Sequence, residues 1–368
     1  MHDLESNDRE FFRRKISRNW SRRRFVKYSS ITVGTGLLTA CTNQLSSTTS
    51  SSNSSTSTTA TPSASKKEKV IASWLPIMQT TAYYVALEEG LFEKAGIKIE
   101  SAKFENPNQI IDSLVSGRAD FGPPGAAAGI TVLAEAKAPG TFKVFGLQGG
   151  GIKSNFINDG LIVKPDSPIQ SFKDLKGKKI GTLPGIQWRT ITQYILRRNG
   201  LDPDKDLTVE QMAVGLHVTS VVSGAVDATL SLEPVGSIAL STGQAKRAMT
   251  NPVAMFISDP FYSGAAVFTA KFLKERPAVA KKVIQVIDEA TKMANQNFDK
   301  YRPILAKYTA IKPDQVKYVA QPRLRSFSDL DRADINSYQA LIDVLQKEGV
   351  LGQSMKAQNL ILEKAQLA

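Results

Sequence analysis

The chain has 368 residues, with 47 Lys and Arg against 34 Asp and Glu and a formal net charge of +13. Nine of the basic and four of the acidic residues lie within residues 1–41, which leaves 38 against 30 in the remainder. So small and dispersed an excess does not predict nucleic-acid binding. One cysteine and two histidines exclude an intrachain disulfide and leave too few ligands for a His/Cys metal cluster. The composition therefore predicts no metal site, and no cofactor is expected.

Two motifs at the N-terminus predict where the protein goes. Arg22 and Arg23 open the run RRRFVK, which resembles a twin-arginine export signal, and Cys41 closes the run LTAC, which resembles a lipobox. The apolar stretch between them, residues 28–40, is too short to span a bilayer. A basic tail and a buried structural thiol are the alternatives. We expect residues 1–41 to be a lipoprotein signal, with the lipid on Cys41.

Residues 42–66 are dominated by Ser and Thr and carry almost no charge until their end. Such a segment buries too little apolar surface to offset the entropy of ordering it, which predicts a flexible tether. A structureless loop without that purpose is the alternative. With the lipid on Cys41, the tether predicts a domain held at the membrane in the periplasm or cell envelope.

From residue 70 the hydrophobic pattern alternates between strands and helices. We expect strands over residues 70–73, 97–104, 120–121, 142–147, 178–183, 207–213 and 227–232. Helices are expected between them over residues 81–89, 109–116, 126–136, 188–199 and 218–223. This order predicts an α/β architecture with a mostly parallel sheet. Longer helices are expected over 277–298, 301–309 and 328–347.

Two similar cassettes lie about 100 residues apart. Gly117 and Asp120 stand between an expected helix and an expected strand, and Gly224 and Asp227 repeat that arrangement. Glycine ends the helix in the left-handed conformation, and the aspartate can hydrogen-bond the turn that enters the strand. The cassettes suggest two lobes on one plan, although a shared local solution without a shared function is the alternative.

Four stretches carry a resemblance to a known family. They are residues 83–97 (YYVALEEGLFEKAGI), 117–122 (GRADFG), 172–181 (FKDLKGKKIG) and 232–234 (LEP). The sequence resembles bacterial ABC-transporter solute-binding proteins of the nitrate, sulfonate, taurine and pyrimidine-precursor group, over most of residues 69–347. The resemblance implies the two-lobe periplasmic binding protein fold (type II), with the ligand in a cleft between the lobes.

The resemblance also implies the division of the chain. We expect lobe one to contain residues 67–165 and 263–368 and lobe two residues 166–262, with crossings near 160–167 and 261–270. The C-terminal helices would return to lobe one. The implied partners are a small-molecule ligand and the permease subunits of an importer, the expected state is a monomer, and no catalysis is expected.

In open α/β sheets the ligand site lies beyond the carboxyl ends of the strands. The loops that follow the expected strands therefore supply the candidate ligand-binding residues. These are Trp74, Gln79, Thr80, Tyr83, Gly122, Pro123, Gly125, Gly185, Gln187, Trp188, Glu233 and Tyr262.

Each of the more telling candidates has a structural alternative. Trp74 and Trp188 could be core residues, and residues 122–125 could be a plain turn. Glu233 could be a solvated acid, and otherwise it needs a cationic or donor partner, in the ligand or in Arg189. His217 is expected to be a partly exposed residue at a helix start.

The ligand class stays open at this point. The resemblance permits sulfonates, nitrate-like anions and heterocyclic amines, and the two tryptophans and Glu233 favour an organic ligand with an apolar part and a donor group. Two rival functions are a ligand-sensing lipoprotein without transport and a pyrimidine-precursor synthase. The second is disfavoured because that chemistry depends on histidine and cysteine, and the exported part has one histidine.

Overall fold

The computed structural model describes residues 67–153 and 155–367, so the predicted signal with Arg22, Arg23 and Cys41 and the tether over 42–66 lie outside the described residues. Two β-sheets organise the described part. The first sheet has the order β11-β4-β10-β3-β1-β2. Its strands are β1 (Glu68–Trp74), β2 (Ile97–Lys103), β3 (Phe121–Ala127), β4 (Phe142–Gly150), β10 (Phe261–Thr269) and β11 (Arg323–Arg325).

The second sheet has the order β7-β6-β8-β5-β9. Its strands are β5 (Asp159–Val163), β6 (Lys179–Thr182), β7 (Thr208–Gln211), β8 (Ala228–Leu232) and β9 (Lys246–Thr250). Each sheet with its helices forms one lobe, so the described residues have the expected two-lobe α/β fold.

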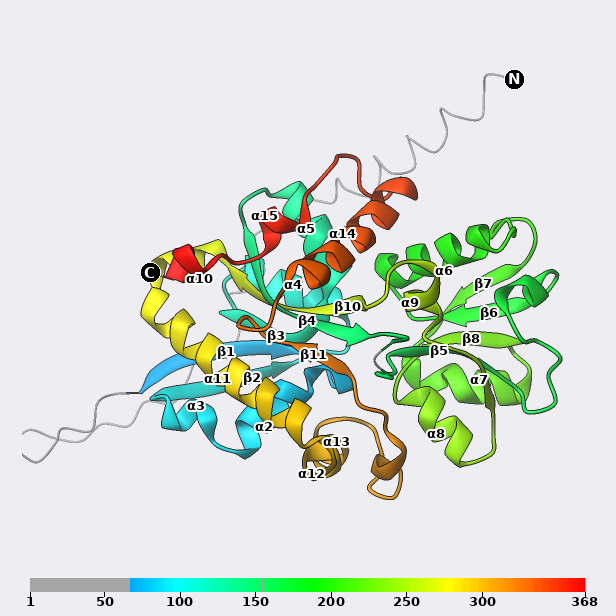
Figure 1. Ribbon diagram of the computed structural model, residues 1–368, viewed down its shortest axis with the longest axis horizontal. Helices are drawn as coiled ribbons and strands as arrows, with labels where there is room; N and C mark the ends of the chain where they lie inside the picture. Colours follow the sequence, from blue (N-terminus) through cyan, green and yellow to red (C-terminus); the bar gives the residue numbers. More distant parts are fainter. Residues whose placement is uncertain (1–66, 154, 368) are drawn as a thin grey trace, which may run out of the picture. The chain divides into compact units, whose positions relative to one another are not determined.

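The chain changes sheets earlier than expected. β5, which the sequence analysis put in lobe one, pairs with β8 and β9 of the second sheet. β10, which was expected to be a crossing, is a full strand between β3 and β4 of the first sheet (Figure 1). The crossings therefore occupy residues 151–158 and 251–260. The runs DGLIV and FYSGAAVFT are buried throughout because they are sheet strands.

Both sheets are mixed, whereas a mostly parallel sheet was expected. β1 runs parallel to β2 and β3, and β6 runs parallel to β7 and β8. β10 and β5 run antiparallel to their neighbours. Each of these two strands follows a crossing and enters its sheet directly from the other lobe. Parallel neighbours in one sheet are usually joined by a helical crossover, and these two strands have none before them.

The first lobe carries most of the helices. They are α2 (Thr81–Glu88), α3 (Leu91–Lys94), α4 (Pro107–Val115), α5 (Ala128–Lys137), α10 (Ala270–Glu275), α11 (Pro277–Gln296), α12 (Phe298–Tyr301), α13 (Leu305–Tyr308), α14 (Arg332–Lys347) and α15 (Ala357–Leu360). The second lobe has α6 (Ile186–Arg198), α7 (His217–Ser223), α8 (Val235–Ser241) and α9 (Pro252–Phe256). Short 3₁₀ turns, η1 (Met78–Thr80) among them, fill several connections.

The helix starts follow local chemistry. Asn106 caps α4 with a capping box and Pro107 stands at its first position, and Pro277 does the same for α11, as expected. The single helix expected over 301–309 is interrupted by a 3₁₀ turn at Arg302–Ile304, which contains Pro303. A proline inside a helix removes a backbone donor and clashes with the preceding turn, so the α-helix does not continue through it.

The run Gly122-Pro123-Pro124-Gly125 was expected to end its strand, but it does not. It lies inside β3, which continues to Ala127. The pairing of β3 with β10 skips Pro123 and Pro124, because the register shifts between Ala265 and Val267. An irregular pairing of this kind tolerates prolines, which cannot donate to the ladder.

The C-terminal helices return to the first lobe, as expected. α11 packs on α2, and α14 packs on α5 and β10 and also reaches α6. Figure 1 shows α11 as the long yellow helix beside the first sheet. Within the described residues no helix is both long and apolar enough to cross a bilayer.

Candidate functional site

A cavity of about 630 Å³ opens between the lobes. Its first-lobe wall contains residues 75–79, which follow β1, and Ala127 and Ile130 around the start of α5. Its second-lobe wall contains residues 183–185 with Gln187 and Trp188, which follow β6, and residues 232–235 at the end of β8. The cavity therefore lies at the carboxyl ends of parallel strands from both sheets, where such folds place their ligands. We call it the cleft.

Six of the twelve predicted residues line the cleft, namely Gln79, Gly125, Gly185, Gln187, Trp188 and Glu233. The other six, Trp74, Thr80, Tyr83, Gly122, Pro123 and Tyr262, lie in the wall behind it or in a lobe core. The loops selected from the sequence reach the cleft, because the strand ends fix their positions. It did not determine which side chain of each loop turns toward the cleft.

Trp74 and Tyr83 belong to the core of the first lobe. The ring of Trp74 lies 5.4 Å from Tyr84 and 6.2 Å from both Tyr83 and Tyr308 between centroids. The Tyr83 side chain is fully buried and its hydroxyl hydrogen-bonds Ser101 Oγ at 2.5 Å. For Trp74 the core alternative is therefore the observed one.

Thr80 and Gly125 lie in close contact at the cleft wall, where Gly125 lines the cleft and Thr80 lies behind it. Thr80 Oγ1 donates to the Leu75 carbonyl at 3.0 Å. A Cβ at Gly125, whose φ is 108°, would come within 2.4 Å of that hydroxyl. Only glycine fits at position 125, because it alone lacks the Cβ and adopts this φ without strain.

Gly122, Pro123 and Tyr262 complete the wall without lining it. A Cβ at Gly122 would meet Ile110 at 3.3 Å, and Pro123 is buried inside β3. The Tyr262 hydroxyl points to α14, where it donates to Asp334 and accepts from Arg323 Nε at 2.8 Å. The neighbours of Tyr262, Ser263 and Gly264, line the cleft in its place.

Gln187 connects the two lobes at the cleft. It stands in the first turn of α6, is 2% exposed, and donates from Nε2 to the Ser263 carbonyl of β10 at 3.0 Å. Its Oε1 accepts from the Gly129 N–H in the first turn of α5 at 2.6 Å. One side chain of the second lobe thus bonds the backbone of the first lobe at two places.

Glu233 is buried and already has a cationic partner. Arg247 of β9 donates to its Oε1, and the Ser237 N–H donates to its Oε2 at 3.0 Å. The two side chains are 1% and 9% exposed. Arg189, the partner considered from the sequence, is exposed. The expectation that Glu233 awaits a ligand donor is therefore not supported, because the protein supplies that donor itself.

The two crossings meet in a buried polar cluster. The Asn251 side chain accepts from the Asn158 N–H at 2.8 Å and donates to the Phe156 carbonyl at 2.8 Å. Asp159 accepts from the Val253 N–H at 3.1 Å and from Asn158 Nδ2 at 3.0 Å. Burial raises the pKa of Asp159 from 3.8 to about 6, although these hydrogen bonds oppose the shift.

His217 begins α7 as expected but is fully buried, which corrects the expectation of partial exposure. Its Nδ1 lies 2.8 Å from Ser231 Oγ and its Nε2 lies 3.2 Å from the Met212 carbonyl. A carbonyl can only accept, so Nε2 carries the hydrogen and Nδ1 accepts from the serine. Burial lowers the pKa of His217 to about 4, which keeps the ring neutral.

Much of the cleft lining was not expected from the sequence, and most of it is apolar. These residues include Ile77, Ile130, Leu183, Val214, Val218, Ile238 and Ile311. Several of them follow expected strands, and this position could have indicated the cleft. Apolar residues in such loops are, however, equally typical of a core. The charged residues of the lining are Lys103, Glu105 and Glu233. Lys103 pairs with Glu105 at 3.8 Å and Glu233 pairs with Arg247.

Comparison with known proteins agrees with this geometry. The model of the family described as NMT1/THI5 like matches residues 77–300, well over half of the chain. The chain belongs to the NMT1/THI5-like family. This confirms the family suspected from the four sequence stretches.

Three similar proteins show the range of this family and fold. A putative aliphatic sulfonates-binding protein of Bacillus subtilis is 28% identical over 211 residues, which span 57% of this NMT1/THI5-like chain and 60% of that protein. A 4-amino-5-hydroxymethyl-2-methylpyrimidine phosphate synthase of Uromyces fabae is 29% identical over 48% of the chain and 49% of its own length. The match thus spans less than two thirds of either relative.

Among solved structures, the periplasmic aliphatic sulphonate binding protein of Escherichia coli aligns with a TM-score of 0.64 at 16% identity. The alignment covers 80% of this chain and 92% of that one. At this identity the likeness establishes the fold alone, which is the periplasmic binding protein fold expected from the sequence.

Proposed function

We propose that this chain is the extracytoplasmic solute-binding component of an ABC importer and captures a small organic anion, such as a sulfonate, in the cleft. The observation that carries this proposal is the cleft itself, which is about 630 Å³ in volume and is built from strand ends of both lobes. Its volume lies in the range of sites for organic ligands and far exceeds the size of nitrate. The sulfonate-binding relative supports the class of ligand.

The lining indicates how such a solute would be held. α5 and α6, from different lobes, both begin at the cleft, where the N-terminal N–H groups of a helix favour an anionic head group. The apolar residues Ile130, Leu183 and Val218 offer contacts for a hydrocarbon body. A solute with both parts fits this wall better than taurine, whose hydrocarbon body is short, or nitrate, which has none.

A thermal-shift and calorimetric series on the purified chain tests the proposal. The probes are alkanesulfonates of three to eight carbons, benzenesulfonate, taurine, nitrate and 4-aminopyrimidine. A ligand that binds only the folded state raises the melting temperature. We expect the shift to grow with the length of the apolar body and to be smallest for nitrate. A shift with nitrate or with 4-aminopyrimidine, and with no sulfonate, would contradict the proposed ligand class.

We further propose that the protein is exported by the twin-arginine pathway and anchored through a lipid on Cys41. The motifs around Arg22, Arg23 and Cys41 support this. Replacing both arginines with lysine should block export. Cys41→Ala should release the exported protein from membranes, because a lipidated residue is an anchor and not a span. Sedimentation of the Cys41→Ala protein with membranes after a high-salt wash would contradict the anchor.

The synthase among the relatives raises a catalytic alternative, and the sensing role also stays open. In the described part of the chain both ring nitrogens of His217 already have partners in the second lobe, Ser231 and Met212, which disfavours a catalytic role for this ring.

Transport and sensing differ in one measurement. Deletion of the gene should abolish uptake of a labelled sulfonate by cells if the protein delivers its ligand to a permease, and uptake would persist for a sensor.

A further inference from the structure

Gln79 has an unusual hydrogen-bonding state on the cleft wall. It lies in η1 directly after β1, lines the cleft and is 1% exposed. Its Nε2 donates to Asn158 Oδ1 at 2.9 Å, across to the first crossing. Its Oε1 is buried and has no hydrogen-bond partner among the described residues. A buried acceptor in this state is unfavourable, so a donor that reaches it gains a full hydrogen bond.

The orientation of the Gln79 amide is fixed by a chain of hydrogen bonds. Asp159 accepts through Oδ1 from the Val253 N–H and through Oδ2 from Asn158 Nδ2. Asn158 therefore turns its Nδ2 to Asp159 and its Oδ1 to Gln79. Gln79 must meet that oxygen with its own Nε2, so Oε1 is the end of the amide that is left without a partner, on a residue that lines the cleft. A reversed Gln79 amide would bring two acceptors together.

We propose that Gln79 Oε1 accepts a hydrogen bond from the bound solute and so makes the cleft selective for solutes with a hydroxyl or N–H group in addition to the anionic head. This inference rests on the proposed function, because it names a further feature of the same solute. Asp159 sets this selectivity without contacting the solute, since it determines through Asn158 which end of the Gln79 amide faces the cleft.

Protonation of Asp159 reverses the chain. A proton taken from solvent on Oδ2 makes that oxygen a donor to Asn158 Oδ1. Asn158 then turns its Nδ2 to Gln79 Oε1, and Gln79 offers Nε2 to the solute. The charged groups that face Asp159 from β8 and β9 are Glu233, which favours protonation, and Arg247, which opposes it, while α9 contributes no charged side chain. Solutes with an added donor are therefore preferred above about pH 6 and solutes with an added acceptor below it.

Calorimetric titration of the full chain with matched solutes tests the inference. The probes are ω-hydroxyalkanesulfonates of three to six carbons and their ω-methoxy counterparts, which accept but do not donate. At pH 7.5 we expect one chain length to bind about tenfold more tightly as the hydroxyl than as the methoxyl. Gln79→Met should abolish this ratio. Asp159→Asn, which donates from Nδ2 to Asn158, should invert it. Gln346→Met, exposed on α14, is the matched glutamine control for folding.

The outcomes separate this inference from the proposed function. Binding of the sulfonates with no hydroxyl preference at any chain length, or a preference that survives Gln79→Met, overturns the inference and leaves the function intact. If Asp159→Asn does not fold, as judged by circular dichroism, Gln79→Met decides. If no sulfonate binds, the proposed ligand class fails, and the Gln79 side-chain amide signal in NMR decides: titration near pH 6 supports the chain of hydrogen bonds, and an unchanged signal overturns it.

Discussion

Glu233 and Arg247 illustrate how a buried charge at the cleft is satisfied within the protein. Both side chains are at least nine-tenths buried, and the Ser237 N–H and hydroxyl supply further bonds to the pair. Desolvation of two charges offsets much of their attraction, so the pair itself adds little net stability. Removing one partner is costly, because the other remains buried and uncompensated.

Glu233→Gln is therefore expected to act on stability before it acts on binding. We expect the free energy of unfolding to fall by about 3 kcal/mol, because Arg247 keeps its charge without a counter-charge. Urea unfolding followed by circular dichroism measures this. Glu275→Gln is the control, since that residue pairs with Lys271 at 4.0 Å in an exposed position. Unchanged stability with a large loss of sulfonate affinity would return Glu233 to the role of a ligand contact.

His217 should make the protein lose stability on acidification. The ring is neutral in the folded state with a pKa of about 4, against 6.5 in the unfolded chain. Between these values the unfolded state binds a proton that the folded state does not. The stabilisation is therefore complete above pH 6.5 and falls by about 3 kcal/mol as the pH drops to 4.

The pH profile of urea unfolding for the wild type and for His217→Gln measures this contribution. Gln can still donate to the Met212 carbonyl and does not titrate. Asp159 contributes with the opposite sign, because its raised pKa makes the folded state take up a proton between pH 6 and 4. The difference between the two profiles isolates His217, and parallel profiles would show that its pKa is not depressed.

The location of a single residue could be predicted from the sequence where the end of a strand fixes it. Gln187 and Glu233 follow strand ends, and that alone brings them to the cleft. Trp74 also ends a strand, but successive side chains of a strand face opposite ways, and its ring turns into the first-lobe core. The partner of Glu233 could not be predicted either, because Arg247 lies on β9, an edge strand that the pattern did not reveal.

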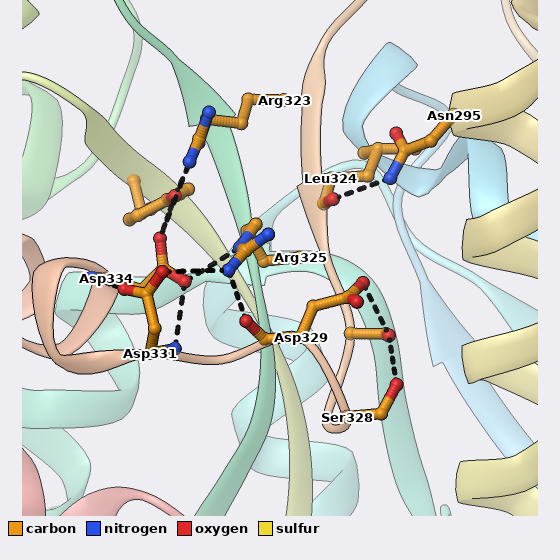
Figure 2. Close-up of polar contacts among 10 residues, drawn as sticks. Asn295, Arg323, Leu324, Arg325, Ser328, Asp329, Asp331 and Asp334 are labelled. Atoms are coloured by element: carbon orange, nitrogen blue, oxygen red, sulfur yellow. Dashed lines mark hydrogen bonds and ion pairs between the residues drawn. The ribbon is translucent and has the colours of Figure 1, made fainter.

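At the scale of elements, one buried carboxylate joins three parts of the first lobe. Asp334 accepts from Tyr262 of β10, from Arg325 Nε of β11 at 2.7 Å, and from the Asp331 N–H at 3.1 Å (Figure 2). Asp331 in return caps α14 by accepting from the Asp334 N–H at 3.0 Å. The capping box that starts the last long helix therefore also fastens it to the sheet.

Asp334→Ala is expected to lower the free energy of unfolding by about 3–5 kcal/mol, the usual cost of breaking a buried charged network. Asp343→Ala on the same helix is the control, because Asp343 is exposed. Chemical unfolding of both variants provides the comparison. A small loss, similar in both, would mean that α14 is held by its apolar face and not by this network.

Elements were predictable where local chemistry marks them. The start of α11 followed from Pro277, whereas α4 begins two residues before the expected position 109, because Asn106 caps it and Pro107 stands at its first position. β5 and β10 were missed as strands because the resemblance assigned crossings there, and their continuous burial gives no alternation. β3 was ended too early because two prolines normally argue against a strand, and the irregular pairing that admits them is a tertiary feature.

At the scale of the whole molecule, Gln187 is expected to favour the arrangement in which the lobes meet. Its two bonds to Gly129 and Ser263 exist only when the lobes are joined at the cleft. At about 1 kcal/mol for each hydrogen bond, Gln187→Ala should weaken sulfonate binding about tenfold or more. Gly129→Ala should act in the same direction, because its Cβ would lie 2.8 Å from Gln187 Oε1.

Small-angle scattering and calorimetry together test this role. The radius of gyration of the wild type should fall on ligand binding, as hinge closure at the two crossings requires. The Gln187→Ala variant should reach the same final radius of gyration as the wild type, but only at a higher ligand concentration. Equal affinities in the wild type and both variants would show that Gln187 does not contribute to closure.

The two-lobe fold could be predicted as a whole because the family resemblance implies it, and the alternating elements and the repeated cassettes agree with it. The positions of the crossings could not, since nothing local distinguishes a crossing from a strand. The long-range pairings of β10 with β3 and β4 decide them.

The place of β10 also sets an order of assembly. It stands between β3 and β4, so the first sheet lacks its middle until residue 269 has been made. The second sheet is complete at residue 250 and is one uninterrupted segment. During synthesis the lobe that starts later can therefore fold first. Until β10 and β11 are made, β4 of the lobe that starts earlier has no partner strand and β3 has one unpaired edge, and open edges of this kind favour aggregation.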